Sequence, residues 1–366
     1  MWSKPISMNV PQRVLVIVTR RLGDVLLATP LIRTIRKAWP KISIDVLVFK
    51  NTEGVIVNNP DIEKIITIEE DSTIWSDIRL ILKIFRRYDM SFSTLAGDRQ
   101  VFYSWLAGKY SVGLVPDSGI NHFWKRCLLS KWVYLDNLNT HTVLMNLKLA
   151  QLLDLNLHHD VIVSWKEADE YRVAAMLPFD MMSEPFAVIH MYPKYPYKEW
   201  SKEGWIKLAL WLDEKGINIV FTGNKEVNET NDIRHIFNSL PSRSVNMIGK
   251  FSLSEVGFLL SRATVYIGPD TVITHMAAAQ GIPTIALYGP TNPVKWGPWP
   301  KDHHVAQNPF VRQGSQNVKN VFLIQGEGQC VPCHEEGCGR SIESLSDCLQ
   351  NLSPDKIIAA VKQALG

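Results

Sequence analysis

The chain has 366 residues, of which 46% are hydrophobic and 20% are charged. Because single hydrophobic cores seldom grow beyond about 250–300 residues, this length predicts two domains. The net charge of only +3 gives no general affinity for nucleic acid, so no nucleic-acid partner is expected. No apolar run reaches the ~18–20 residues of a membrane span, and the N-terminus has no small-residue signal cleavage site, which predicts a cytoplasmic location.

The first half of the chain alternates strands with helices. Residues 13–18 predict an apolar strand, and residues 24–39 have apolar side chains at helical spacing, with Pro30 early enough to bend or delay the helix. The elements expected next are a strand at 44–49, a helix at 74–87, a strand at 90–95, and helices at 101–106 and 142–153. This alternation predicts an α/β fold with a doubly wound parallel sheet.

The same rhythm restarts after a segment that carries Pro178 and Pro185. The elements expected there are strands at 186–190, 217–222, 245–248 and 264–267, and helices at 201–215, 227–240 and 252–261. We therefore expect a first domain over residues 1–165, a linker over 166–185 and a second domain over 186–350.

A last helix is expected within residues 351–366. Ser353 suits its N-cap and Pro354 its first position. Its apolar face, formed by Ile357, Val361 and Leu365, predicts that the helix packs back on the first domain.

The stretch from residue 263 to 297 predicts a binding site for a phosphorylated ligand. A buried strand leads into Gly-Pro-Asp-Thr, and Asp270 or Thr271 can cap the helix that follows. The free N–H groups and the dipole of a helix start attract phosphate. Thr271 and His275 are four residues apart, so they share one helical face; alternatively, His275 is an ordinary core histidine.

Three other segments also follow strands, at the sheet edge where ligands bind in such folds. Gly23 and Asp24 follow the first strand, Lys198 follows the first strand of the second domain, and Gly223 ends the next strand. Spacing alone favours a helix cap for Asp24. Lys198 is either exposed or aimed at a ligand.

These motifs resemble glycosyltransferase family 9, the ADP-heptose:lipopolysaccharide heptosyltransferases. Asp270-Thr271 with His275-Met276-Ala277-Ala278-Ala279 and Gly281 is similar to the family's nucleotide-sugar motif. Gly23-Asp24, Lys198-Glu199-Trp200 and Gly223 recur in the family's order, so the resemblance extends from about Arg13 to the C-terminus. The Tyr-Lys-x-Trp segment and the stretch from Trp296 to Trp299 resemble the heptosyltransferase III branch most.

The resemblance implies a GT-B fold, with two Rossmann-like domains facing a central cleft. It implies that Asp24, next to Gly23, is the general base, and that Lys198 contacts the leaving diphosphate, with Lys194 as a less favoured substitute. The implied substrate-binding residues are Gly23, Tyr192, Gly223, Glu226, Asp270, Thr271, Val272 and His275.

Individual roles follow from the same resemblance. The resemblance implies that Glu226 holds the ribose of the nucleotide, and an equal alternative is that Glu226 is a carboxylate in the first turn of a helix. It implies that Asp270 binds the sugar hydroxyls. It also implies that the helix start at Thr271, together with His275, holds the diphosphate. Many members of the family have a small hydroxyl residue at the position of Tyr192 and a small residue at the position of Val272.

The implied function is inverting transfer of heptose from ADP-heptose to the inner core of lipopolysaccharide. No metal and no cofactor are expected in catalysis. The alternatives are a transferase that uses another nucleotide sugar and a non-catalytic sugar-nucleotide-binding protein. A nicotinamide oxidoreductase and a P-loop NTPase are disfavoured, because neither G-x-G-x-x-G after the first strand nor G-x-x-x-x-G-K-[ST] occurs.

The implied partners are an ADP-sugar donor and a lipopolysaccharide core or lipid A-linked acceptor. The acceptor would bring the chain, as a peripheral protein, to the cytoplasmic face of the inner membrane. Segments 78–87 and 124–132 mix basic, aromatic and aliphatic residues as a membrane-resting surface does, and an ordinary amphipathic surface is the alternative.

Four of the five cysteines cluster near the C-terminus, at Cys330, Cys333, Cys338 and Cys348. A CxxC pair with two further thiols is compatible with structural zinc, but the second pair lacks the spacing of a zinc ribbon, so reduced thiols are an open alternative. Because the cluster lies outside the motifs described above, we expect it to be dispensable for catalysis.

Overall fold

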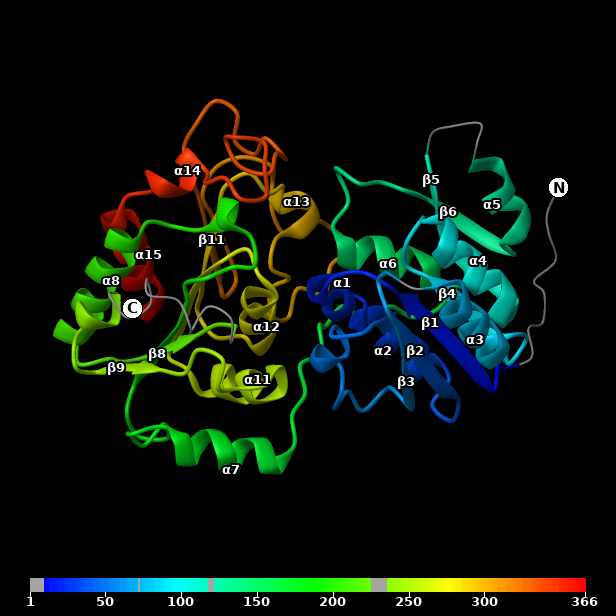
Figure 1. The fold of residues 1–366 in the computed structure, drawn as a ribbon, viewed down its shortest axis with the longest axis horizontal. Helices are drawn as coiled ribbons and strands as arrows, with labels where there is room; N and C mark the ends of the chain where they lie inside the picture. The colour runs from blue at the N-terminus through cyan, green and yellow to red at the C-terminus, as the bar shows by residue number, and fades with distance from the viewer. Residues whose placement is uncertain (1–9, 72, 118–121, 225–235) are drawn as a thin grey trace. The chain divides into compact units, whose positions relative to one another are not determined.

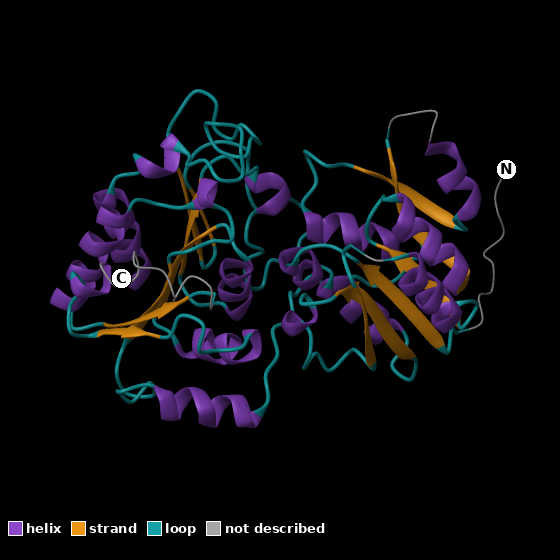
Figure 2. Cartoon of the chain, viewed as in Figure 1, coloured by secondary structure: helices purple, strands orange, loops and turns teal. Residues whose placement is uncertain are grey.

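The computed structural model describes residues 10–71, 73–117, 122–224 and 236–366 (Figures 1 and 2). The chain divides into two compact units. The first comprises Met1–Glu53, Asn59–Asn137 and Thr142–His159, and the second comprises Gly54–Asn58, Leu138–His141 and Asp160–Gly366. Figure 2 shows helices on both faces of a sheet in each unit.

The first unit contains a six-stranded parallel sheet in the order β3-β2-β1-β4-β5-β6. The strands are β1 (Arg13–Val18), β2 (Ser43–Phe49), β3 (Lys64–Ile68), β4 (Tyr88–Ser93), β5 (Gly108–Pro116) and β6 (Lys131–Leu135). The helices are α1 (Leu22–Leu27), α2 (Thr29–Ala38), α3 (Ile74–Ile84), α4 (Asp98–Ala107), α5 (Phe123–Leu128) and α6 (Thr142–Gln151). This strand order is that of the Rossmann fold, whose ligand crevice lies beside the central strand, here β1.

The helix expected after β1 is two helices. α1 ends at Leu27 and α2 starts at Thr29, with Pro30 at its second position. Proline has no N–H to donate, so it fits the first turn of a new helix and not the interior of a longer one. The expected effect of Pro30 is therefore confirmed.

The second unit contains a seven-stranded sheet in the order β12-β13-β11-β10-β7-β8-β9, parallel except for the β12–β13 pair. The strands are β7 (Phe186–His190), β8 (Asn218–Thr222), β9 (Ser244–Asn246), β10 (Val265–Pro269), β11 (Thr284–Tyr288), β12 (Gln316–Val318) and β13 (Val321–Gln325). The helices are α7 (Glu167–Met176), α8 (Lys202–Glu214), α11 (Leu253–Arg262), α12 (Val272–Gln280), α13 (Pro293–Trp296), α14 (Asp347–Gln350) and α15 (Pro354–Leu365). Most of the helix expected at 227–240, and Glu226 itself, lie outside the described residues.

Half of the expected linker is a helix. α7 occupies Glu167–Met176, and its start is fixed by the Lys166 N–H, which donates to Asp169 Oδ2 at 2.8 Å. Arg172 of α7 pairs with Glu255 of α11, and the two helices pack together. Pro178 and Pro185 both follow the end of α7, so they indicate where a helix must have ended, but they do not exclude a helix before them.

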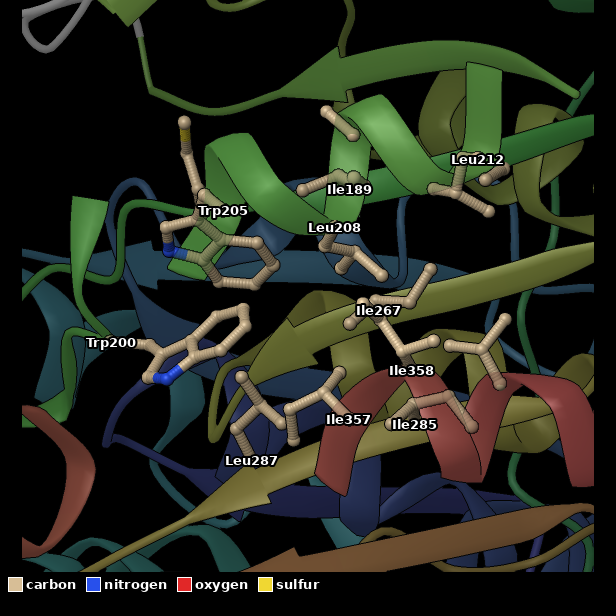
Figure 3. Packing of buried hydrophobic residues seen from close by; sticks show 14 of the residues in the cluster. Ile189, Trp200, Trp205, Leu208, Leu212, Ile267, Ile285, Leu287, Ile357 and Ile358 are labelled. Carbon is tan, nitrogen blue, oxygen red and sulfur yellow. The ribbon is translucent and has the colours of Figure 1, made fainter. Parts of the chain in front are cut away.

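The last helix belongs to the second unit, so the prediction that it packs on the first domain is wrong. Ile357 and Val361 of α15 are fully buried in a core cluster with Leu208 of α8 and Ile285 of β11. Figure 3 shows Ile357 packed with Leu208 and Ile285 in this cluster. An apolar helix face requires burial, but it does not specify which surface provides it. Among the described residues, no helix has both the length and the apolar character needed to cross a bilayer.

Candidate functional site

The ligand-binding edge of the second sheet is defined by two neighbouring strands. β7 pairs with β10, while β8 continues the sheet on one side and β11 on the other. From β7 the chain continues to β8 on one side, and from β10 it continues to β11 on the other side. In open α/β sheets, a point where the strand order reverses in this way opens a ligand crevice at the carboxyl ends of the strands. Lys198 follows β7, and Asp270 follows β10.

Lys198 and Asp270 meet at this edge. Lys198 Nζ lies 2.5 Å from Asp270 Oδ2 and 3.3 Å from the Asp270 carbonyl oxygen. The lysine side chain is 18% exposed and the carboxylate 8% exposed, so the ion pair is largely shielded from water. Lys194 is exposed and lies over the Tyr195 ring instead, so Lys198 is the one of these two lysines that pairs with Asp270.

The loop that carries Lys198 is anchored in the core. Trp200 is 3% exposed, donates from Nε1 to the Leu352 carbonyl at 2.7 Å and meets the Trp205 ring edge-on (Figure 3). Tyr192 packs against the same core cluster. Because both ends of the loop are fixed, the position of the ammonium group is set by the fold.

Asp270 is the centre of a buried polar network. Tyr288 Oη lies 3.2 Å from Oδ1, Thr291 also hydrogen-bonds to the carboxylate, and His275 Nε2 lies 3.9 Å away. Burial by itself would raise the pKa of Asp270, but the neighbouring Lys198 and His275 and the hydrogen bonds from Lys198 and Thr291 hold it below its ordinary value. The carboxylate is therefore charged and accepts hydrogen bonds only.

α12 presents the start of a helix beside this carboxylate. Thr271 is the N-cap residue, but its side chain makes no capping bond, so neither Asp270 nor Thr271 caps the helix in the expected way. The first N–H groups of α12, from Val272 onward, have no partner within the helix and remain available for an anion.

His275 lies one turn into α12. It is 5% exposed, and its Nδ1 is buried without a hydrogen-bond partner among the described residues. Burial lowers the pKa of His275 to about 4, although the adjacent Asp270 acts in the opposite direction. The imidazole is therefore neutral at neutral pH, and a neutral ring nitrogen can donate a hydrogen bond to a bound ligand.

The end of β7 adds another buried histidine. His190 Nδ1 lies 3.1 Å from Thr222 Oγ1, at the last residues of β7 and β8. Gly223 follows, and a Cβ there would lie 3.1 Å from Ile248 Cγ2, so the position favours glycine. Glu226 lies outside the described residues.

No motif in the sequence pointed to His190, Tyr288 or Thr291. Tyr288 and Thr291 belong to the glycine turn that ends β11, and parallel strands place such a turn at the same edge as Asp270. The turn itself was visible in the sequence. The sequence did not show which side chains of this turn reach Asp270, because that depends on the twist and register of β10 and β11.

Asp24 of the first unit lies in α1, directly after β1. It is 7% exposed, and its Oδ1 lies 3.6 Å from Arg20 Nη1. The N-cap residue of α1 is Arg21, with no side-chain cap, so the interpretation of Asp24 as the N-cap is wrong. Asp24 occupies the third position of the helix beside Gly23, where the helix dipole favours a negative charge.

Comparisons with known proteins assign the chain to a family. A match to the glycosyltransferase family 9 (heptosyltransferase) model covers residues 105–322. The chain is 24% identical over 287 residues to lipopolysaccharide heptosyltransferase 3 of Escherichia coli K12, covering 76% of this chain and 82% of that protein. It is 22% identical over 303 residues to the lipopolysaccharide core heptosyltransferase OpsX of Haemophilus influenzae, covering 81% and 84%.

Solved structures agree on the fold. A glycosyl transferase family 9 protein from Veillonella parvula superposes with a TM-score of 0.81 at 19% identity, covering 99% of both chains. The ADP-heptose lipopolysaccharide heptosyltransferase II of E. coli superposes with a TM-score of 0.71 at 19% identity, covering 96% of this chain and 98% of that one. The two Rossmann-like units therefore form a GT-B fold, and the chain belongs to glycosyltransferase family 9.

Proposed function

We propose that this glycosyltransferase moves heptose from ADP-heptose to a sugar of the inner core of lipopolysaccharide, with inversion at the anomeric carbon. The observation that carries the proposal is the buried Lys198–Asp270 pair beside the open start of α12. The similarity to proteins named lipopolysaccharide heptosyltransferases, and to a heptosyltransferase structure solved with an ADP-heptose analogue, supports the donor and the acceptor class.

The second unit would bind the donor. The N–H groups at the start of α12 and the Nδ1 of His275 would hold the diphosphate, and Asp270 would accept hydrogen bonds from sugar hydroxyls. Negative charge builds on ADP as it leaves, and Lys198 would stabilise that charge. The remaining expected contacts to the donor are Tyr192, Gly223, Glu226, Thr271 and Val272.

Asp24 would act as the general base. Its carboxylate takes the proton of the acceptor hydroxyl while the hydroxyl oxygen forms a bond to the anomeric carbon. The bond from that carbon to the diphosphate breaks, and ADP leaves with the bonding electrons. Direct displacement of this kind inverts the anomeric centre, and Asp24, Lys198 and the start of α12 supply the groups that it requires.

A panel of nucleotides tests the donor. Thermal unfolding is followed with ADP, UDP and GDP and with their sugars, because a ligand that binds the native state raises the melting temperature. We expect ADP and ADP-heptose to stabilise the chain selectively, and ADP-heptose to support transfer to a truncated lipopolysaccharide. Stabilisation by UDP with no effect of ADP would favour a different nucleotide sugar. ADP-heptose binding without transfer would favour a non-catalytic binding protein.

The lipid-linked acceptor would bring the chain, as a peripheral protein, to the cytoplasmic face of the inner membrane, and α3 offers a matching surface. One face of the helix is buried through Leu80 and Ile84. The opposite side exposes large apolar side chains, namely Ile74, Trp75, Ile78, Leu82 and, just past the helix end, Phe85. Four exposed cations lie among them: Arg79, Lys83, Arg86 and Arg87. Apolar side chains flanked by cations suit a bilayer that contains anionic lipid.

Vesicle co-sedimentation tests this surface. We expect binding to vesicles of phosphatidylglycerol and phosphatidylethanolamine, weaker binding to phosphatidylcholine, and a loss of binding in Leu82→Ser/Lys83→Glu. Val311→Ser is the matched control, because Val311 is 64% exposed and belongs to the second unit. Equal sedimentation of both variants would contradict a role for α3.

A further inference from the structure

The carboxylate of Asp270 needs more than one partner to fix its plane. The last torsion of an aspartate side chain, about the Cβ–Cγ bond, has broad and roughly two-fold preferences, so the backbone alone does not orient the two oxygens. Lys198 Nζ holds Oδ2 at 2.5 Å. Rotation about the Cβ–Cγ bond moves the other oxygen, Oδ1, so the direction of Oδ1 depends on a second partner.

Tyr288, the last residue of β11, is a partner of Oδ1. Pro269 of β10 is in register with Leu287 of β11. The next residues along these two parallel strands, Asp270 and Tyr288, therefore lie side by side at the carboxyl edge of the sheet, and Tyr288 Oη is 3.2 Å from Asp270 Oδ1. Tyr288 is 0% exposed, so protein atoms cover its hydroxyl, and it can influence a bound sugar only through Asp270.

The hydroxyl of Tyr288 is also held by contacts other than the carboxylate. Its Oη lies 2.8 Å from the carbonyl oxygen of Trp296, the last residue of α13. The backbone carbonyl of Tyr288 accepts a hydrogen bond from the Gly326 N–H at 2.8 Å. Burial and the nearby Asp270 raise the pKa of Tyr288 well above its ordinary value, so the phenol is neutral and shares one hydrogen between its two acceptors. These contacts make Oη a fixed reference point for Oδ1.

We propose that Tyr288 is a positioning residue that aims Oδ1 of Asp270 at a hydroxyl of the donor sugar. An ionised carboxylate offers about four acceptor sites. Lys198, Tyr288 and Thr291 each donate to one, which leaves about one site for a sugar hydroxyl. The direction of that site matters because a hydrogen bond weakens steeply as its angle departs from linearity. This role rests on the proposed function, in which Asp270 binds the sugar.

Removal of the phenol oxygen should separate the sugar contact from the diphosphate contacts. Tyr288→Phe keeps the ring that packs in a core cluster with Ala278 and Phe310. It also leaves Lys198 and the start of α12, which would hold the diphosphate, unchanged. We therefore expect ADP to bind with wild-type affinity. ADP-heptose should lose roughly 10-fold of the additional affinity that its sugar provides, which is the lower end of the contribution of one hydrogen bond to a charged group.

Calorimetric titration of the full-length chain with ADP and with ADP-heptose tests this role. The matched control is Tyr88→Phe, because Tyr88 is 2% exposed and donates from Oη to the buried Asp45 Oδ2 at 2.7 Å, an equivalent contact in the first unit. Tyr88→Phe should bind both ligands as the wild type does. The proposal would be overturned if Tyr288→Phe kept the wild-type ratio of the two affinities. Equal losses for ADP and ADP-heptose keep that ratio and would indicate a general structural role.

Thermal unfolding provides a second measurement, which needs no ligand. Residues in contact have non-additive effects on stability, so Tyr288→Phe should lower the melting temperature less in an Asp270→Ala background than in the wild type. Equal losses in the two backgrounds would also overturn the proposal. A wild-type chain that binds ADP-heptose no more tightly than ADP would overturn the sugar contact of Asp270 and this role together. A wild-type preference for ADP-heptose that Tyr288→Phe retains would overturn the role of Tyr288 alone, so the two failures are distinguishable.

Discussion

Lys198 Nζ lies 2.5 Å from Asp270 Oδ2 and joins the loop after β7 to the loop after β10. The two residues are 72 positions apart in the chain, and both are shielded from water. The pair neutralises the cation before a donor arrives. We infer that a bound diphosphate must share Lys198 with Asp270, so the ammonium is already positioned when charge develops on the leaving group.

Replacement of Lys198 should affect catalysis and stability separately. Lys198→Ala should lower single-turnover transfer by about 10²–10³-fold, the usual cost of losing one electrostatic stabiliser. It should also lower the unfolding free energy, since it leaves the buried Asp270 carboxylate without its cation. Lys198→Ala/Asp270→Asn should recover stability and remain inactive. Lys194→Ala is the control and should transfer normally; near-normal transfer by Lys198→Ala would assign the role elsewhere.

Asp24 should be required for transfer and not for donor binding. Asp24→Asn keeps the size of the side chain and costs the helix start only about 0.3–1 kcal/mol of dipole stabilisation. An amide cannot accept the acceptor's proton at neutral pH, so transfer should be lost. Calorimetry with ADP should show unchanged affinity, because the donor residues belong to the other unit. Unchanged single-turnover transfer would make Asp24 structural.

Folding stability should fall in mild acid because of three buried histidines. Burial lowers the pKa of His190 and His275 to about 4 and that of His141 to about 3. The unfolded chain takes up these protons near the ordinary histidine pKa of about 6.5, and the native chain does so only near 4 or below. The contribution of these histidines to the free energy of unfolding is therefore fully present above about pH 7. It is lost as the pH falls from 6.5 toward 4, by about 1.4 kcal/mol per pH unit for each histidine.

Urea unfolding at several pH values between 7.5 and 5 measures this slope. A variant such as His190→Asn should unfold with a shallower pH dependence than the wild type, whatever its absolute stability. An unfolding free energy that does not change with pH across this range would show that the three imidazoles are hydrated in the native state.

Gly204 should be required for the anchor of the Lys198 loop. A Cβ at this position of α8 would lie 2.5 Å from Cζ2 of Trp200. Gly204→Ala should therefore destabilise the fold by about 1–3 kcal/mol, despite the higher helix propensity of alanine, and should weaken ADP binding by displacing Trp200. Gly54→Ala is the control, because its nearest neighbour would be at 3.4 Å. Melting temperatures and ADP titrations of both variants check the prediction.

Much of the architecture follows from the sequence alone. Strands and helices alternate with clear periodicity, which predicts parallel sheets. Because parallel strands have their carboxyl ends on one edge, the sequence alone predicts that the residues after β7, β8 and β10 lie near a common site. Pro30 correctly indicated an interruption between α1 and α2. Local preference and chain direction are sufficient for these conclusions.

The tertiary structure decided which surfaces and side chains meet. The apolar face of α15 had no sequence signal for its partner and packs in the second unit, and the polar segment before β7 became α7 because α11 offered it a packing surface. Lys198 proved to be paired with Asp270, and Tyr288 joined the same network. These contacts depend on sheet order, twist and register, which bring distant residues within a few ångströms, and periodicity along the chain does not encode those distances.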